Sequence, residues 1–279
     1  MTLRIGCVGC GNMGGAIMSG LARPGTGNEN RNSAYSLCGY NRTASRMQAL
    51  EKAGVRVMAS PLAVAENADI ILLAVKPYQI HEIMEQIRPA LSKDKVIVSV
   101  AAGITMQSLQ QWASGRSPVV RCMPNTPALV GMGVFALCFE DPALSNERRQ
   151  DILQLFSVLG QCVEMGEDKF TAFSALIGAG PAYVFAMMQG LVQAGVTMGF
   201  PHAQARQMVT ALFAGSARMA EEDATPLAQL RDNVCSPGGL TIAGVNALDR
   251  AGLTGLLVDA VLAANARGAE MEKNSGQGH

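Results

Sequence analysis

The stretch LRIGCVGCGNMGGAIMSGL, residues Leu3 to Leu21, decides the fold of the N-terminal half. Its first six residues are mostly apolar or small, which is typical of a buried β-strand. Glycines at 9, 11 and 14 follow with the spacing G-x-G-x-x-G, and an apolar helical pattern begins directly after them. A strand, this turn and a helix in that order open the β-α-β unit of dinucleotide-binding proteins. The first glycine forms the tight turn, the second lets the backbone approach a pyrophosphate, and the third packs the helix against the strand.

The same loop contains a second pattern, Cys7-Val8-Gly9-Cys10, with the spacing of a redox couple or of half a zinc site. A structural zinc needs four ligands, but the remaining candidates, Cys38 and three histidines, are scattered along the sequence. A redox couple would occupy the helix N-terminus that the pyrophosphate needs. We therefore predict that the glycines govern the loop and that no metal binds. Cys7 is then a core residue, and Cys10 a small loop residue beside the pyrophosphate.

Strand and helix patterns alternate up to about residue 166, and this alternation predicts an α/β domain of the Rossmann type, with a doubly wound parallel sheet. The run Ala68–Val75 is apolar at nearly every position, as expected for a strand buried on both faces. Up to Met123 the pattern predicts six strands and four helices between them. A helix at Glu147–Leu159 and strands at Val134–Phe139 and Cys162–Met165 extend the pattern. The first strands are predicted at Leu3–Val8, Tyr35–Tyr40, Val55–Val57, Ala68–Val75, Lys95–Val100 and Val119–Met123, and the helices at Gly14–Leu21, Ala44–Ala53, Ile80–Leu91 and Gln107–Ala113.

From residue 167 onward the sequence predicts helices alone. Several have little polar surface, because apolar residues between Met187 and Met198 cannot all face one side. Such helices are buried on most sides, so we expect a second subunit to cover them. The predicted organisation is a Rossmann domain over residues 1–166 and an all-helical dimerisation domain over 167–279. The helices are expected at Asp168–Leu176, Pro181–Met198, Ala203–Glu221, Pro226–Val234, Leu240–Ala251 and Gly252–Met271.

Composition narrows the function further. The 22 Lys and Arg balance the 22 Asp and Glu, so no strong overall field would attract nucleic acid or an anionic membrane. The N-terminus lacks the pattern of a secretory signal, and the run Ile70–Val75 is too short to span a bilayer. Seven cysteines, an odd number, suggest free thiols rather than a disulfide framework. We expect a soluble cytoplasmic protein without nucleic-acid or membrane partners.

The end of the second strand indicates the cofactor. NAD-dependent enzymes place Asp or Glu there to bind the ribose 2′-hydroxyl, whereas this chain has Asn41-Arg42-Thr43. Because a guanidinium suits a 2′-phosphate, the sequence predicts NADPH, with NADH as the alternative. Further loops at the same sheet edge are expected to complete the pocket, namely Ala74-Val75-Lys76-Pro77, Val100-Ala101-Ala102 and Met123-Pro124-Asn125-Thr126-Pro127.

The helical half contains the block Ser236-Pro237-Gly238-Gly239-Leu240-Thr241. Amides of Gly239, Leu240 and Thr241 open a helix and, with the Ser236 hydroxyl, could hold a carboxylate. An ordinary corner between two helices would also explain the block. The corner Gly178–Tyr183 has the same two interpretations.

Together these motifs resemble the pyrroline-5-carboxylate reductases, the oxidoreductases of the last step of proline biosynthesis. The likeness runs from Leu3 to Glu270, and the Ser-Pro-Gly-Gly-x-Thr and Met-Pro-Asn-Thr-Pro blocks are its most specific parts. Two departures are Ala179 and Ser60-Pro61, where members often carry Ser and Asn. The insertion Pro24 to Asn32 looks peripheral.

The resemblance implies NAD(P)H-dependent reduction of the cyclic imine 1-pyrroline-5-carboxylate to L-proline by a homodimer formed through the helical domain, often within a decamer. Thr241 would be the catalytic residue and would hold the proton on the imine nitrogen. The substrate would contact Ser236, Gly239, Leu240 and Thr241. The cofactor would contact Val8, Gly9, Cys10, Gly11, Asn12, Met13, Asn41, Arg42, Ala74, Val75, Lys76, Pro77, Val100, Ala101 and Ala102.

Two other functions stay open at this point. A β-hydroxyacid dehydrogenase shares the architecture but needs a catalytic Lys at the start of a glycine-rich helix, and residues 180–199 contain no Lys or Arg. A regulator that senses the dinucleotide would bind NADPH without a substrate site, and the Ser236–Thr241 block disfavours it.

Overall fold

The structure is a computed structural model that describes residues 2–23 and 35–275, with side chains through Glu272. The predicted insertion Pro24 to Asn32 lies outside the described residues. The chain forms two compact units, one of residues 1–178 with 265–279 and the other of residues 179–264. Each unit is described separately, and the predicted division at 166/167 remains a prediction.

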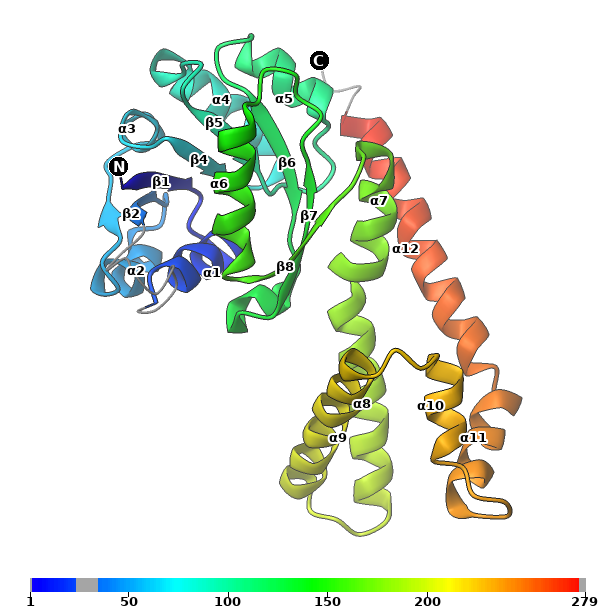
Figure 1. The fold of residues 1–279 in the computed structure, drawn as a ribbon. Coiled ribbons are helices and arrows are strands. Elements are labelled where there is room, and N and C mark those ends of the chain that lie inside the picture. Colours follow the sequence, from blue (N-terminus) through cyan, green and yellow to red (C-terminus); the bar gives the residue numbers. More distant parts are fainter. Residues whose placement is uncertain (1, 24–34, 276–279) are drawn as a thin grey trace. The chain divides into compact units, whose positions relative to one another are not determined.

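The first unit contains an eight-stranded sheet with the order β3-β2-β1-β4-β5-β6-β7-β8 (Figure 1). Its first six positions have the strand order of the Rossmann fold, which confirms the predicted doubly wound sheet. Neighbouring strands of these six are parallel. The strands are β1 Leu3–Val8, β2 Tyr35–Tyr40, β3 Arg56–Val57, β4 Ile70–Leu73, β5 Val96–Ser99, β6 Val119–Met123, β7 Gly133–Cys138 and β8 Gly160–Glu164.

The last two strands depart from the parallel arrangement. Strand β7 pairs with β6 in the antiparallel direction, and β8 then pairs with β7 in the parallel direction. Only residues 124–132 connect β6 to β7, and this connection is too short for the crossover that a parallel neighbour needs. The two added strands were predicted without a direction, and the antiparallel pairing of β7 with β6 is a feature that the strand pattern alone did not indicate.

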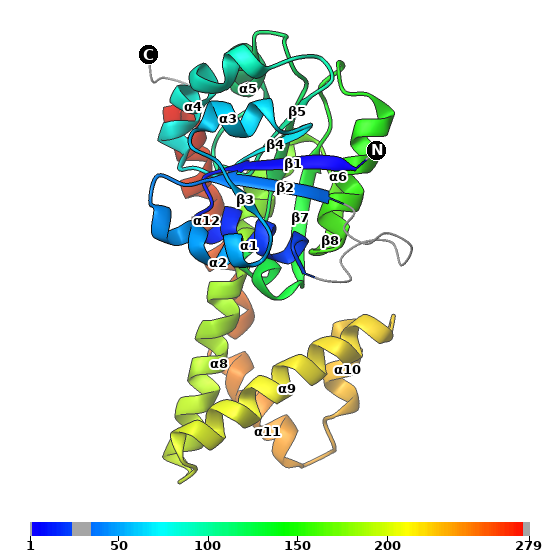
Figure 2. The same ribbon diagram turned by 90° about the vertical axis from the view of Figure 1, so that its left-hand side faces the viewer.

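Helices cover both faces of the sheet, because the central strands are apolar on both faces. Cys7, Leu72 and Val98 are paired in one row across the strands and face one core. In the neighbouring row, Ile71 and Ile97 are paired and face the other core. Helices α1, α2 and α6 pack on the first core, and α3, α4, α5 and α7 on the second. Figure 2 shows α1 and α2 on one side of the sheet and α3, α4 and α5 on the other. The helices are α1 Asn12–Leu21, α2 Gln48–Lys52, α3 Pro61–Glu66, α4 Ile80–Ile87, α5 Met106–Ala113, α6 Asn146–Ser157 and α7 Phe170–Phe173.

Helix α3 is absent from the prediction, although its start carries a local signal. The Ser60 hydroxyl accepts a hydrogen bond from the Ala63 amide at 3.1 Å, and Pro61 occupies the first helical position. Both features are typical of a helix N-terminus. The helix then buries Val64 and Ala65 against the second core.

A buried arginine joins several elements of the first unit. Arg121 on β6 forms ion pairs with Glu167 at 2.8 Å and with Glu272 of α12 at 2.9 Å, and its guanidinium lies 4.7 Å from the Phe170 ring centroid. Glu167 also accepts the amide of Met106, the first residue of α5, at 2.6 Å. Because a buried guanidinium needs such partners, Arg121 fixes the end of α12 and the start of α5 to the sheet.

The second unit is helical, as predicted, but its core is small. Helices α8 and α9 pack through Val192, Ala205 and Val209, the three residues of its buried cluster. A methyl group on Gly195 would lie 3.0 Å from the Ala205 Cβ, so glycine permits this close crossing. The helices are α8 Gly180–Thr197, α9 His202–Glu222, α10 Leu227–Asn233, α11 Leu240–Arg250 and the first part of α12 Leu253–Ser275.

Large apolar side chains remain exposed on every helix of this unit. Examples are Phe185, 64% exposed, Leu212, 56%, Leu227, 71%, and Leu256, 62%. Among the described residues, the helical stretch Glu167–Thr197 is long and apolar enough to cross a membrane by length and composition alone. Large apolar side chains exposed on every helix of one unit are typical of a protein or membrane interaction site.

Candidate functional site

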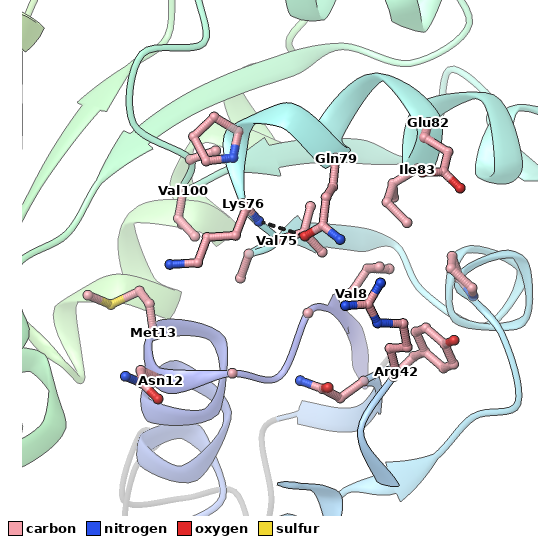
Figure 3. A pocket seen from close by; sticks show the side chains of 18 of the residues that line it. Val8, Asn12, Met13, Arg42, Val75, Lys76, Gln79, Glu82, Ile83 and Val100 are labelled. Carbon is pink, nitrogen blue, oxygen red and sulfur yellow. Dashed lines mark hydrogen bonds between the residues drawn. The ribbon is translucent and has the colours of Figure 1, made fainter. Parts of the chain in front are cut away.

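A pocket of about 600 Å³ lies at the carboxyl ends of β1, β2, β4 and β5 (Figure 3). This is where open α/β sheets bind ligands, and the volume is within the range of cofactor pockets. The pocket is lined by Val8, Gly9, Gly11, Asn12, Met13, Tyr40, Asn41, Arg42, Thr43, Arg46, Pro61, Ala74, Val75, Lys76, Pro77, Gln79, Glu82, Ile83, Gln86, Val100, Ala101 and Ala102. It thus brings together every residue predicted to contact the cofactor except Cys10.

The glycine-rich turn forms the floor beside β1. Gly9 has a φ of +96°, and its amide donates to the Tyr40 carbonyl at 2.9 Å, which ties the turn to β2. A Cβ atom on Gly9 would meet the Ala74 carbonyl carbon at 2.7 Å. Only glycine accepts both this left-handed backbone and this close approach.

Gly11 and Gly14 have different roles in the turn: Gly11 borders open space, and Gly14 lies in a tightly packed position. A Cβ atom on Gly11 would have only the Gly9 oxygen, 3.9 Å away, as a near neighbour, whereas one on Gly14 would meet that oxygen at 2.4 Å. Helix α1 begins after Gly11, and its first intrahelical bond runs from the Gly15 amide to the Gly11 oxygen at 2.8 Å. The amides before Gly15 therefore lack an intrahelical acceptor, and the helix dipole adds positive potential at the same place.

Two arginines follow strand β2. The Asn41 side chain accepts the Thr43 amide at 2.9 Å and shapes this loop, on which Arg42 lies. Within the described residues Arg42 has no acidic partner. Arg46, a residue of the next turn, donates to Asn12 Oδ1 at 2.8 Å and so connects the β2 loop to the start of α1. No carboxylate follows β2 where a ribose 2′-hydroxyl would need one.

The opposite wall comes from the ends of β4 and β5. The Lys76 amide donates to Gln79 Oε1 at 3.2 Å, and the Gln79 amide donates to the Lys76 carbonyl at 2.9 Å. This reciprocal pair fixes the turn into α4 (Figure 3). Val100 and Ala101 are buried just after β5, where their small side chains leave room for a ring.

The charges of the pocket suit a ligand with several phosphates. Arg42, Arg46 and Lys76 supply three cations, while Glu82 is the one carboxylate among the lining residues. The open space at Gly11 and the free amides of α1 add a second means of binding an anion. The residues present therefore fit a phosphorylated dinucleotide.

The cysteine pair lies under the turn and outside the pocket. Cys7 and Cys10 are both buried in the first core, and the Cys10 thiol donates weakly to the Cys7 carbonyl at 3.6 Å. The hydrogen bond between the two thiols, together with burial, raises the pKa of Cys7 well above its ordinary value. The expectation that the Cys10 side chain lies beside a bound pyrophosphate does not fit this orientation, since only its backbone belongs to the turn. All seven cysteines are free.

The loop Met123–Pro127 does not line the pocket, contrary to the prediction. Asn125 Oδ1 accepts the Val134 amide at 2.9 Å, and its Nδ2 donates to the Ile177 carbonyl at 3.4 Å. The loop follows β6, the strand beyond β5, and it turns into the antiparallel strand β7. Its residues are therefore used to shape that turn.

The Ser236–Thr241 block lies in the second unit, at the start of α11. Gly238 has a φ of +67°, a left-handed conformation that favours glycine, and a Cβ atom on Gly239 would lie 2.3 Å from the Ser236 hydroxyl, which would have to rotate away. Gly239 caps α11, which leaves the first amides of that helix without intrahelical acceptors. Leu240 is 95% exposed, and Ser236 and Thr241 are exposed as well. The four residues predicted to bind the substrate thus lie together around one helix N-terminus.

Sequence reasoning missed the residues that helices bring to the pocket. They have no motif of their own, because only the packing of α4 on the sheet turns one of its faces toward the glycine-rich turn. The one local signal was the spacing of Arg46, four residues after Arg42. The missed residues on or beside helices are Arg46, Pro61, Gln79, Glu82, Ile83 and Gln86, and Tyr40 at the end of β2 was missed as well.

No three His, Cys, Asp or Glu side chains of the described residues cluster as a metal site would require.

Two family models match the sequence. Residues 4–103 match the NADP oxidoreductase, coenzyme F420-dependent family, and residues 167–271 match the pyrroline-5-carboxylate reductase dimerisation family. The matches agree with the predicted Rossmann and helical dimerisation domains.

Similar proteins of known name match nearly the whole chain. A pyrroline-5-carboxylate reductase of Pisum sativum is 35% identical over 96% of this chain and 95% of its own length. The structure of such a reductase from Coxiella burnetii, 31% identical, superposes with a TM-score of 0.86 over 97% of this chain and 99% of its own. The structure from Plasmodium falciparum, with NADP bound, is 28% identical, with a TM-score of 0.85 over 97% and 98%. By its sequence and its fold, the chain belongs to the pyrroline-5-carboxylate reductase family.

Proposed function

We propose that this protein reduces 1-pyrroline-5-carboxylate to L-proline with NADPH, the last step of proline biosynthesis. The observation that carries the proposal is the pairing of two sites in one chain of this family. The first unit holds a cationic pocket for a phosphorylated dinucleotide, and the second holds an exposed helix N-terminus with a hydroxyl at Thr241.

The cofactor would bind along the edge of the sheet. Amides at the start of α1 would hold the pyrophosphate, and Arg42 and Arg46 would meet the 2′-phosphate, which favours NADPH over NADH. When bound, NADPH supplies the hydride for the imine carbon. Backbone and side chains would contact the cofactor at Val8, Gly9, Cys10, Gly11, Asn12, Met13, Asn41, Arg42, Ala74, Val75, Lys76, Pro77, Val100, Ala101 and Ala102, with Cys10 contributing backbone alone.

The substrate would bind at the start of α11. Ser236 and the amides of Gly239 and Leu240 would hold its carboxylate. The imine nitrogen must carry a proton to be reduced, and the hydroxyl of Thr241 would accept a hydrogen bond from that N–H and keep the proton in place. Because the nitrogen is already protonated when the hydride arrives, the reaction needs no separate histidine or lysine base.

We also propose that the protein is a cytoplasmic homodimer formed through the helical domain, residues 167–279, and that dimers assemble into decamers. The exposed apolar side chains of α8 to α12 support a partner subunit, and the stretch Glu167–Thr197 lies entirely within the residues that match the dimerisation family. A homodimer therefore accounts for that apolar stretch without a membrane.

An absorbance assay tests the activity. NADPH oxidation is followed after addition of pyrroline-5-carboxylate and, separately, of a β-keto acid. Oxidation with the imine alone supports the proposal, oxidation with the keto acid indicates a β-hydroxyacid dehydrogenase, and oxidation with neither indicates a dinucleotide sensor.

A matched pair of variants tests Thr241. Loss of one hydrogen bond to a charged group costs about 1.5–3 kcal/mol, so Thr241→Val should lower kcat roughly 10- to 150-fold with an unchanged Kd for NADPH. Thr241→Ser keeps the hydroxyl and should stay close to wild type. Equal turnover of Thr241→Val and wild type would contradict the role given to this hydroxyl.

A further inference from the structure

The cofactor pocket contains one charge of the wrong sign for phosphate. Glu82 lines it together with Arg42, Arg46 and Lys76. A carboxylate repels every phosphate of a dinucleotide, so its place in the pocket calls for a ligand group that donates hydrogen bonds. Glu82 lies in the first turn of α4, where a negative charge interacts favourably with the helix dipole. That interaction does not explain why the carboxylate lines the pocket.

Glu82 belongs to one face of α4 that is turned toward the pocket. Gln79, Glu82, Ile83 and Gln86 line it with the spacing of a single helical face. Ile83 is buried and offers an apolar surface, while Glu82 Oε1 accepts a hydrogen bond from Gln86 Nε2 at 3.2 Å. Both Glu82 and Gln86 are exposed, so the carboxylate is open to a ligand, and its hydrogen bond with Gln86 favours an orientation next to the apolar Ile83.

The remaining parts of the pocket account for the other parts of the dinucleotide. The amides of α1 suit the pyrophosphate, Arg42 suits the 2′-phosphate, and the small residues after β5 suit the nicotinamide. Met13, Lys76 and Val100 lie toward one end of the pocket, and Arg42, Ile83 and Glu82 toward the other (Figure 3). The α4 face is thus left for the base that is attached to the 2′-phosphorylated ribose.

We infer that Glu82, oriented by Gln86, recognises the 6-amino group of adenine and makes the pocket selective for an adenine dinucleotide. Adenine presents an amino donor beside the N1 acceptor, whereas hypoxanthine presents a carbonyl oxygen beside an N–H. A carboxylate accepts from the amino group and repels that oxygen. The second Nε2 hydrogen of Gln86 can donate to N1. Ile83 supplies the apolar contact for the ring. This inference rests on the proposed binding of NADPH.

The test compares dissociation constants for NADPH and for its hypoxanthine analogue, measured by nicotinamide fluorescence without imine substrate. Wild type should bind NADPH about tenfold more tightly than the analogue, the value of one exposed hydrogen bond to a charged group. In Glu82→Gln the ratio should fall to about one or two, because the glutamine amide can donate to the carbonyl of hypoxanthine.

The matched control is Glu85→Gln. It makes the same change of charge on the same helix, but Glu85 lies outside the pocket lining and pairs with Arg88. Glu85→Gln should keep the tenfold ratio, and thermal unfolding of both variants should resemble that of wild type.

Other results separate the inference from the function on which it rests. A ratio near one in wild type, or an unchanged ratio in Glu82→Gln, overturns the inference. A change confined to the preference between NADPH and NADH also overturns it, because Glu82 would then contact the ribose. Failure of wild type to bind either reduced cofactor contradicts the proposed function itself.

Discussion

Two alanine substitutions in the glycine-rich turn should have different effects: Gly14→Ala should lower the stability of the fold, and Gly11→Ala should lower the affinity for NADPH. In Gly14→Ala the new Cβ would lie 2.4 Å from the Gly9 oxygen, 2.8 Å from the Ala74 Cβ and 3.0 Å from the Cys7 Sγ. In Gly11→Ala the nearest atom would be the Gly9 oxygen at 3.9 Å. The first substitution therefore disturbs packing, and the second places a methyl group in the pocket.

The magnitude for Gly14→Ala follows from how little the neighbours can move. Ordinary contacts begin at 3.4 Å, so the Gly9 oxygen is 3.4 − 2.4 = 1.0 Å too close. Gly9 is held by its hydrogen bond to Tyr40 and Ala74 by its hydrogen bond to Val8, both at 2.9 Å. Overpacking typically costs about 1–3 kcal/mol, and a clash with backbone held in this way lies at the upper end, about 3 kcal/mol, which corresponds to about 6–12 °C in Tm for a unit of this size.

Gly11→Ala should leave Tm within about 2 °C of wild type, because its methyl group meets no protein atom closely. It should nevertheless weaken NADPH binding at least about tenfold, since the backbone can no longer approach the pyrophosphate. Thermal unfolding without cofactor and a fluorescence titration with NADPH measure the two effects separately. An unchanged Tm for Gly14→Ala, or unchanged NADPH affinity for Gly11→Ala, would refute the assignment of the two glycines.

Four further predictions concern charges and thiols. Arg42→Gln should raise the Kd for NADPH about tenfold or more while that for NADH changes less than about threefold, because only NADPH carries the 2′-phosphate. The Arg121 side chain is 4% exposed between carboxylates that are about a quarter exposed, so Arg121→Met should cost about 2–4 kcal/mol in urea unfolding; a loss below 1 kcal/mol would contradict the packing described. Burial opposes ionisation of Glu272, but hydrogen bonds from Arg121 and Thr171 lower its pKa overall. Its contribution to stability is thus present above the unfolded pKa of about 4.3 and is lost as pH falls through the lower folded value, and Glu272→Gln should lose less stability than wild type over that range. Iodoacetamide should label Cys10 only after unfolding, as read by mass spectrometry, because its thiol is buried; rapid labelling of the native protein would contradict that burial.

The strands were predictable because each is a short apolar run between turn signals. Strand β4 lies inside the predicted run Ala68–Val75, and β1 matches its prediction. Strand β7 was predicted at Val134–Phe139, but its antiparallel direction was not, since the sequence pattern of a strand does not reveal its direction. The short connection of residues 124–132 carried that information.

The residues of the candidate site also fall into a set that could be predicted from the sequence and a set that could not. Loops that follow strands were predictable, because the carboxyl ends of parallel strands meet at one edge. Residues such as Glu82 and Arg46 were not, since a helix face becomes part of a pocket only through packing over long sequence distances. The orientation of Cys10 was also hidden, because the sequence does not show which side of a loop faces the core.

The small core of the second unit has a consequence for how the protein must be handled. Three buried residues, Val192, Ala205 and Val209, cannot offset the chain entropy of about 86 residues. Most of the burial that folds this half has to come from association with another copy, so its folding equilibrium depends on mass action. A tenfold dilution then costs about 1.4 kcal/mol per association step. Tm should therefore fall with protein concentration, and a single stability value has meaning only with the concentration at which it was measured.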